Sequence, residues 1–82
     1  MSAEISPSLR SELTTYGYTE LRMLPTGEVA GLMTFMFTIG LVVGIDSEGY
    51  RTRFCYPRES YASALEAIRS WDGNGDPPGP WI

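Results

Sequence analysis

Histidine and lysine are absent from this chain of 82 residues, and cysteine occurs once, at Cys55. One cysteine cannot form a disulfide within this sequence, and without histidine it cannot complete a thiolate zinc site. The side chains that most often serve general acid–base and nucleophilic catalysis are therefore scarce. We expect a non-enzymatic protein with no catalytic residues, no cofactor and no metal site.

Positive charge is also scarce. Six basic residues, all of them arginine, stand against ten acidic ones, which gives a net charge of −4 and a pI near 4.5. The arginines are scattered and do not form the basic stripe with which nucleic-acid binders neutralise phosphates, so we expect no nucleic-acid partner. The opening residues, MSAEISPSLR, lack the basic segment and apolar core of a signal peptide. Together with the single cysteine, this predicts a soluble, cytoplasmic protein.

The longest uncharged stretch is VAGLMTFMFTIGLVVGI, residues Val29–Ile45. Its large apolar residues occupy every second position, namely Met33, Phe35, Phe37, Ile39, Leu41, Val43 and Ile45. Successive side chains of a strand point to opposite faces, so this period of two predicts one long β-strand, or two collinear ones. The length is at the lower limit for a membrane helix, and Gly40 and Gly44 match the small-xxx-small pattern of packed membrane helices. The alternation and the β-branched residues favour the strand, and we expect no membrane association.

The other segments predict an α+β fold. Ser6 and Pro7 suit the N-cap and first turn of a helix. We expect helices over residues 7–16 and 59–71, strands over 19–24 and 50–56, and turns over 25–27 and 46–49. The result is a single domain over residues 1–82: a three-stranded antiparallel meander with a long central strand, flanked by an N-terminal and a C-terminal helix that cover one face. A Gly/Pro-rich tail, residues 73–82, follows.

The central strand is too long for its neighbours to cover, which predicts an edge that needs a partner. A domain of this size also has a thin core, and association is one way to stabilise it. We therefore expect a homodimer.

The hairpin over residues 40–56 has two possible registers. A two-residue loop at Ser47 and Glu48 pairs the apolar residues of both strands and puts Arg51 and Arg53 on the opposite face. A bulge that includes Gly49 shifts the neighbours and brings the arginines to the apolar face. We favour the two-residue loop because arginines on a core face cost more free energy than an imperfect turn.

The best candidates for an interaction surface are two arginines and the aromatic residues around them, Arg51, Arg53, Tyr50, Phe54 and Tyr56. Arginine and aromatic residues are enriched at interaction hot spots, although a solvated strand face would show the same pattern. Trp81, in the extended proline-rich tail, is a further candidate. We expect Trp81 and Ile82 to pack back on the domain or on a dimer mate.

Other motifs are weaker. Residues 72–76 have the D-x-N-x-D spacing that begins a calcium loop, but Pro77 stands where glycine is required, so we interpret them as a polar turn. Cys55 has no histidine to activate it and is expected to be a structural strand residue. The carboxylates at turns and element ends show no convergence in the sequence; they are Glu20, Glu28, Asp46, Glu48 and Glu59.

The stretch GLVVGIDSEGYRTRFCY and the ending WDGNGDPPGPWI resemble a set of short uncharacterised bacterial proteins, similar to open reading frames carried on mobile elements such as integron cassettes and prophages. The resemblance covers roughly Gly31–Ile82. It implies an accessory or interaction role and brings no known activity and no catalytic residues.

Two hypotheses of function follow. The first is a non-enzymatic interaction or accessory protein that acts as a homodimer through its sheet, with a protein partner still to be identified. The alternative is a small-molecule binding protein with an apolar pocket between the sheet and the C-terminal helix, lined by Tyr61, Leu65 and Trp71. The methionines at 23, 33 and 36 would make such a pocket adaptable.

Overall fold

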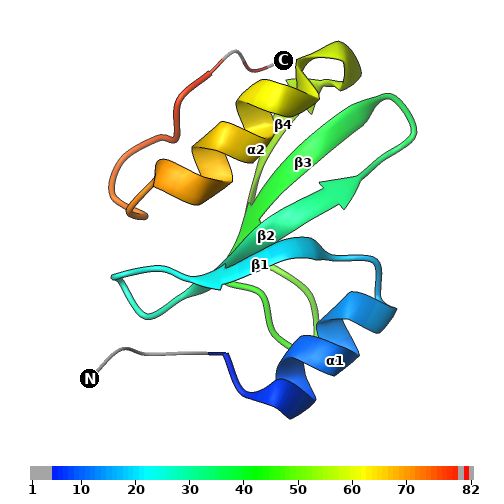
Figure 1. Ribbon diagram of the computed structural model, residues 1–82, viewed down its shortest axis with the longest axis vertical. Coiled ribbons are helices and arrows are strands. Elements are labelled where there is room, and N and C mark those ends of the chain that lie inside the picture. The colour runs from blue at the N-terminus through cyan, green and yellow to red at the C-terminus, as the bar shows by residue number, and fades with distance from the viewer. Residues whose placement is uncertain (1–4, 80, 82) are drawn as a thin grey trace.

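The computed structural model describes residues 5–79 and 81 and shows a four-stranded antiparallel sheet with one helix before it and one after it (Figure 1). The elements are α1 (Pro7–Thr15), β1 (Thr19–Met23), β2 (Val29–Thr34), β3 (Thr38–Val43), β4 (Thr52–Pro57), the short 3₁₀ helix η1 (Arg58–Ser60) and α2 (Tyr61–Ser70). The strand order is β1-β2-β3-β4, a simple meander. The predicted α+β class, antiparallel sheet and flanking helices are confirmed.

The predicted long central strand is wrong, because the chain reverses at Phe35–Phe37 and forms a hairpin of β2 and β3. The Phe35 N–H donates to the Thr38 carbonyl at 2.8 Å and closes a two-residue loop. In this register Leu32 lies opposite Leu41. Even-numbered residues of β2 therefore share a face with odd-numbered residues of β3, and the single period of two conceals a change of parity at the turn. The sheet has four strands where three were predicted.

The predicted register of the second hairpin is confirmed. Leu41 lies opposite Phe54 and Ile39 opposite Tyr56, and an isolated bridge between Asp46 and Gly49 leaves Ser47 and Glu48 as the loop. An Asp46 carboxylate oxygen accepts a 2.8 Å hydrogen bond from the Glu48 N–H, an Asx turn that stabilises this short connection.

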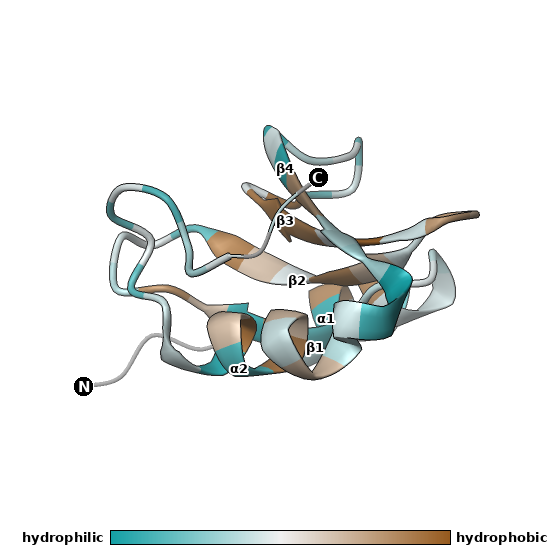
Figure 2. Ribbon diagram, turned by 90° about the horizontal axis from the view of Figure 1, so that it is seen from above, coloured by the Kyte–Doolittle hydropathy of each residue, from teal (hydrophilic) through white to brown (hydrophobic). Residues whose placement is uncertain are grey.

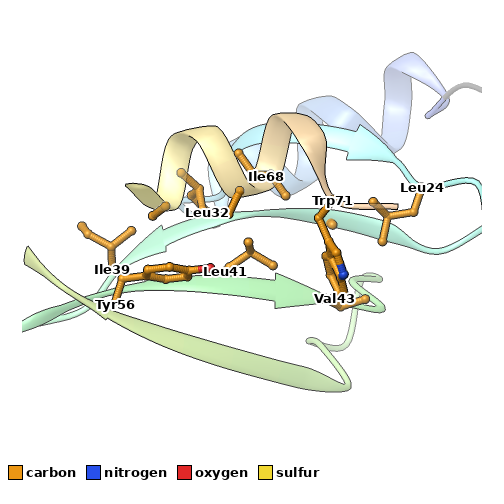
Figure 3. Close-up of a cluster of buried hydrophobic side chains, with 11 residues drawn as sticks. Leu24, Leu32, Ile39, Leu41, Val43, Tyr56, Ile68 and Trp71 are labelled. Atoms are coloured by element: carbon orange, nitrogen blue, oxygen red, sulfur yellow. The ribbon is translucent and has the colours of Figure 1, made fainter. Parts of the chain in front are cut away.

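The helix α2 covers one face of the sheet. Its buried residues Ala64, Ala67 and Ile68 pack on a cluster that includes Leu32 and Tyr56. Figure 3 shows Leu32, Tyr56 and Ile68 of this cluster between the helix and the strands. Most of the large side chains of this cluster have an exposed fraction of only a few per cent. This cluster is therefore the main core of the domain.

The helix α1 covers the other face, so the expectation that both helices share one face is wrong. Leu13 packs on Val29, Val42 and Ile45, whose side chains alternate with those under α2. The two helices accordingly lie well apart in Figure 1. Both parities of Val29–Ile45 supply apolar side chains, and a sheet that is apolar on both faces requires a cover on each.

The helix ends are defined by specific hydrogen bonds. The Ser6 hydroxyl accepts from the Leu9 N–H at 3.2 Å, which confirms the predicted N-cap of α1. A contact that the sequence did not predict stabilises the end of α2: Arg22, on β1, donates from Nη1 to the carbonyls of Ile68 and Trp71 at 2.8 and 2.9 Å. A cation at a helix C-terminus supplies donors that the last carbonyls lack.

Candidate functional site

The aromatic residues predicted as interaction candidates on β4 face α2 and belong to the domain's own packing. Tyr56 is completely buried and its hydroxyl donates to the Pro78 carbonyl. Phe54 lies edge-on to Trp71, with ring centroids 5.8 Å apart, and 5.6 Å from the ring of Trp81. The prediction that Trp81 packs back on the domain is confirmed, while Ile82 lies outside the described residues.

The predicted binding candidate Arg51 is engaged in an ion pair. Its Nε and Nη2 donate to the two carboxylate oxygens of Glu28, each at 2.9 Å, and Nη1 donates to the Thr52 hydroxyl at 3.0 Å. Together these bonds use three of the five N–H donors of the guanidinium. Beside it lies an open depression of about 260 Å³, lined by Gly44, Asp46, Glu48, Gly49, Tyr50 and Arg51.

Arg53 contacts residues from two other parts of the chain. Its guanidinium lies 4.6 Å from the centroid of the Phe35 ring, a cation–π geometry, and Nη1 donates to the Tyr50 hydroxyl at 3.3 Å. The Phe35 ring covers Gly40, where a Cβ would come within 2.4 Å of a ring carbon. Gly40 therefore allows Phe35 to lie flat on the sheet beside Arg53.

The most exposed large apolar side chains of the described residues are at the turn between β2 and β3. Met36 and Phe37 are each 77 % exposed. Arg58, on η1, donates from Nη1 to the Met36 carbonyl at 3.2 Å and connects the turn to the end of β4. In Figure 2 this turn is the hydrophobic projection at one end of the sheet. We call the group Phe35, Met36, Phe37, Arg53 and Arg58 the tip surface.

The tip surface carries positive charge, whereas the chain as a whole has a net charge of −4. Arg51 pairs with Glu28, and Arg69 lies 3.8 Å from Glu20. Within residues 5–79 and 81, no ion pair involves Arg53 or Arg58. The tip surface therefore presents two cations beside exposed apolar groups, on a chain whose net charge is −4.

The space between the sheet and α2 is filled by side chains of the domain. Leu32, Leu41 and Ile68 are almost completely buried there, and Trp71 closes one end. Tyr61, expected to line an apolar pocket, is 42 % exposed. The three methionines do not converge either, since Met23 and Met33 pack under α1 and Met36 projects from the turn. This packing weighs against the small-molecule alternative.

The remaining motifs have structural roles. The Asp72 carboxylate accepts from the Asn74 N–H at 2.9 Å, and the Asn74 carbonyl accepts from the Trp71 indole at 3.2 Å, which is the polar turn expected there. Cys55 is a free, half-buried thiol on β4. Across the described part of the chain, no three carboxylate, cysteine or histidine side chains group together as a metal site would require.

Sequence reasoning selected Arg53 but missed the turn that it contacts. The sequence pattern predicts Phe35, Met36 and Phe37 in the interior of a strand, because the segment Thr34–Thr38 contains none of the usual turn residues. A signal was available in the length of the run, since seventeen residues fit two strands of average length better than one.

No helix of the described residues has the length and apolar character needed to cross a membrane. No family model matches the chain, and no match was found among curated proteins or solved structures.

Proposed function

We propose that this chain is a non-enzymatic interaction or accessory protein that binds a partner protein through the tip surface. The observation that carries the proposal is the exposure of Met36 and Phe37, 77 % each, at the end of a short hairpin next to two arginines that have no carboxylate partner among the described residues. The resemblance to small proteins of mobile elements supports an accessory role.

The composition of the tip surface favours binding. Aromatic residues, methionine and arginine are enriched at protein interfaces. Burying an exposed Met or Phe side chain contributes about 1.5–3 kcal/mol, so the two residues of the turn could supply the centre of an interface. Adjacent exposed apolar side chains with polar groups at their edge are typical of protein interaction sites.

The tip surface is also held in place before any partner arrives. The Phe35–Thr38 hydrogen bond closes the turn, Arg58 holds the Met36 carbonyl, and the Phe35 ring lies between Gly40 and Arg53. A preformed element loses less conformational entropy on binding.

The partner expected from this chemistry is a protein with an apolar pocket whose rim carries carboxylates. Arg58 and Arg53 would lie at the edge of such a pocket and add electrostatic complementarity. A net charge of −4 opposes an approach to anionic lipid, which favours a protein over a membrane surface.

The test is photo-crosslinking from the tip. A p-benzoylphenylalanine residue replaces Phe37, and a matched protein carries it in place of Tyr16, which is 53 % exposed at the C-cap of α1. We expect a discrete adduct from position 37 only, formed with purified partner as well as in extract. We also expect it to weaken with added salt and with Arg58→Glu, while the charge-matched Arg69→Glu on α2 leaves it unchanged.

Two results would overturn the proposal. Identical adducts from positions 37 and 16 would show that the tip surface has no specific partner. Binding to vesicles of phosphatidylcholine and phosphatidylglycerol that is lost in Phe37→Ser would replace the protein partner with a membrane.

A further inference from the structure

We infer that a second copy of this chain pairs with the free edge of β4. The two β4 strands run antiparallel about a twofold axis at Phe54, with Arg53 of each copy opposite Cys55 of the other. This inference rests on the backbone of β4 and holds whether or not the tip surface binds a partner, although the two share Arg53 and its contact with Phe35. The expected homodimer was predicted from a long central strand that the structure does not contain, and the free edge of β4 gives it a different basis.

The two edges of the sheet differ. The edge strand β1 is interrupted between Thr19 and Arg22, where Glu20 adopts a positive φ of 52°. Arg10 from α1 also donates to the Leu21 carbonyl at 3.4 Å. Bulges and covering side chains are common protections of an edge against pairing. The other edge strand, β4, pairs regularly with β3 from Thr52 to Pro57.

The hydrogen-bond pattern identifies the backbone groups on the free side of β4. Residues of an antiparallel strand bond alternately to the neighbour on each side. The bond between Phe35 and Thr38 sets the alternation for β3: Gly40 and Val42 bond to β2, while Ile39 and Leu41 bond to β4.

The same alternation continues onto β4. Tyr56 and Phe54, which lie opposite Ile39 and Leu41, are bonded to β3. The N–H and C=O groups of Arg53 and Cys55 therefore point outward. In the described part of the chain, no other backbone group hydrogen-bonds to them.

This edge complements itself in one register. With the axis at Phe54, Arg53 and Cys55 of the two copies exchange four hydrogen bonds, and every outward N–H and C=O group of these two residues is used. An axis at Cys55 would place Arg53 opposite Pro57, which has no N–H to donate. An axis at Arg53 would put two arginines directly opposite each other, a destabilising like-charge pair.

Side chains favour the same register. Residues at a non-hydrogen-bonded pair approach closely, so the two Phe54 rings would meet on the α2 face, and aromatic cross-strand pairs are stabilising. Phe54 is only partly buried in the single chain, and Trp81 beside it is 43 % exposed. On the other face, each Arg53 guanidinium lies over its own Phe35, so the two charges are drawn back from the axis.

The pairing would produce a continuous eight-stranded sheet. Because the two β4 strands are antiparallel, the tip surfaces would lie at opposite ends. If the proposed function is correct, the dimer is bivalent, and binding two partner sites at once would raise the apparent affinity without new contacts.

The experiment combines sedimentation with a disulfide placed across the axis. Residues of a hydrogen-bonded pair have Cα atoms about 5.5 Å apart, within the range of a disulfide. We expect Arg53→Cys to form a covalent dimer under mild oxidation, through bonds to Cys55 of the other copy. Adding Cys55→Ser should abolish the product. Arg51→Cys, two residues away and just before the start of β4, is the matched control and should not crosslink.

The wild-type protein is the reference for both measurements, because it carries no substitution that could change the β4 edge. We expect it to sediment as a dimer at millimolar concentration and to resist crosslinking, because the two Cys55 residues would be diagonal to each other and beyond the disulfide range. A strict monomer would overturn the inference. A dimer in which wild-type Cys55 crosslinks readily, or Arg53→Cys does not, would overturn the register. Crosslinking from position 37 is measured on a chain that keeps Arg53 and Cys55, so failure of the β4 pairing and failure of the tip surface are distinguishable.

Discussion

Replacement of Tyr56 by phenylalanine tests how the tail is attached to the domain. The Tyr56 ring is completely buried among core residues, and only its hydroxyl reaches out of the core, to the Pro78 carbonyl. Tyr56→Phe keeps the ring and creates no cavity of appreciable size, so the change removes one hydrogen bond and little else.

The expected loss is about 1 kcal/mol in the free energy of unfolding, the usual net value of one intramolecular hydrogen bond. Pro78 is exposed, so its carbonyl can bind water in the variant, and the larger penalty of a buried unsatisfied group does not apply. In a domain of this size, that loss lowers Tm by about 4–8 °C.

The assay is thermal and urea unfolding followed by circular dichroism, with Tyr61→Phe as the matched control. Tyr61 is 42 % exposed at the start of α2, and its hydroxyl makes no hydrogen bond within the described residues, so its loss should cost less than about 0.5 kcal/mol. Equal stability of the two variants would refute the reasoning, because it would show that the bond to Pro78 contributes nothing to the fold.

Two further predictions concern stability. Arg22→Met retains apolar volume but removes the donors to the carbonyls of Ile68 and Trp71, and it should lower the free energy of unfolding by about 2 kcal/mol in urea; a loss below about 0.5 kcal/mol would contradict this role. Burial raises the pKa of Tyr18 and of Tyr56 above the ordinary value of 10.0. Above about pH 10 the unfolded chain therefore binds fewer protons than the folded one, and the free energy of unfolding should fall as the pH rises further. Below about pH 10 these two tyrosines are protonated in both states and should not change the free energy of unfolding. A urea midpoint that does not change through this alkaline range would refute the prediction.

Local signals predicted the parts of the fold that local chemistry determines. Ser6 and Pro7 defined the start of α1, and the apolar pairing across Asp46–Gly49 selected the correct register of β3 and β4. The period of 3.6 located α2 to within a few residues. In each case the residue types that favour the structure lie within or next to the element itself.

The reversal at Phe35–Phe37 could not be predicted in this way. The turn contains no glycine, proline, asparagine or aspartate, and its two aromatic residues continue the apolar pattern of the strands. The turn forms because Leu32 and Leu41 pair on the α2 face of the sheet. At the tip, Arg58 donates to the Met36 carbonyl and the Phe35 ring contacts Arg53, which stabilises the reversal. These contacts join residues that the sequence separates, so pattern reading assigned one strand.

The candidate site was predicted only in part for the same reason. Arg53 was selected from the sequence, but its closest aromatic neighbour is Phe35 on the missed turn, not Phe54 beside it on the strand. Neighbours along a strand point to opposite faces, so proximity in sequence was misleading here. Which arginines stay free of carboxylates also depends on the fold, since Arg51 meets Glu28 only after the sheet forms.

The central claim is that the exposed turn binds a partner protein, and the most direct test is the affinity of that partner for Phe37→Ser. Phe37 is 77 % exposed and is not part of either buried cluster, so the variant should unfold as the wild type does. With purified partner, we predict that the dissociation constant rises at least about tenfold, the effect of losing one interface hot spot. An unchanged dissociation constant, measured on a folded variant, would contradict the account.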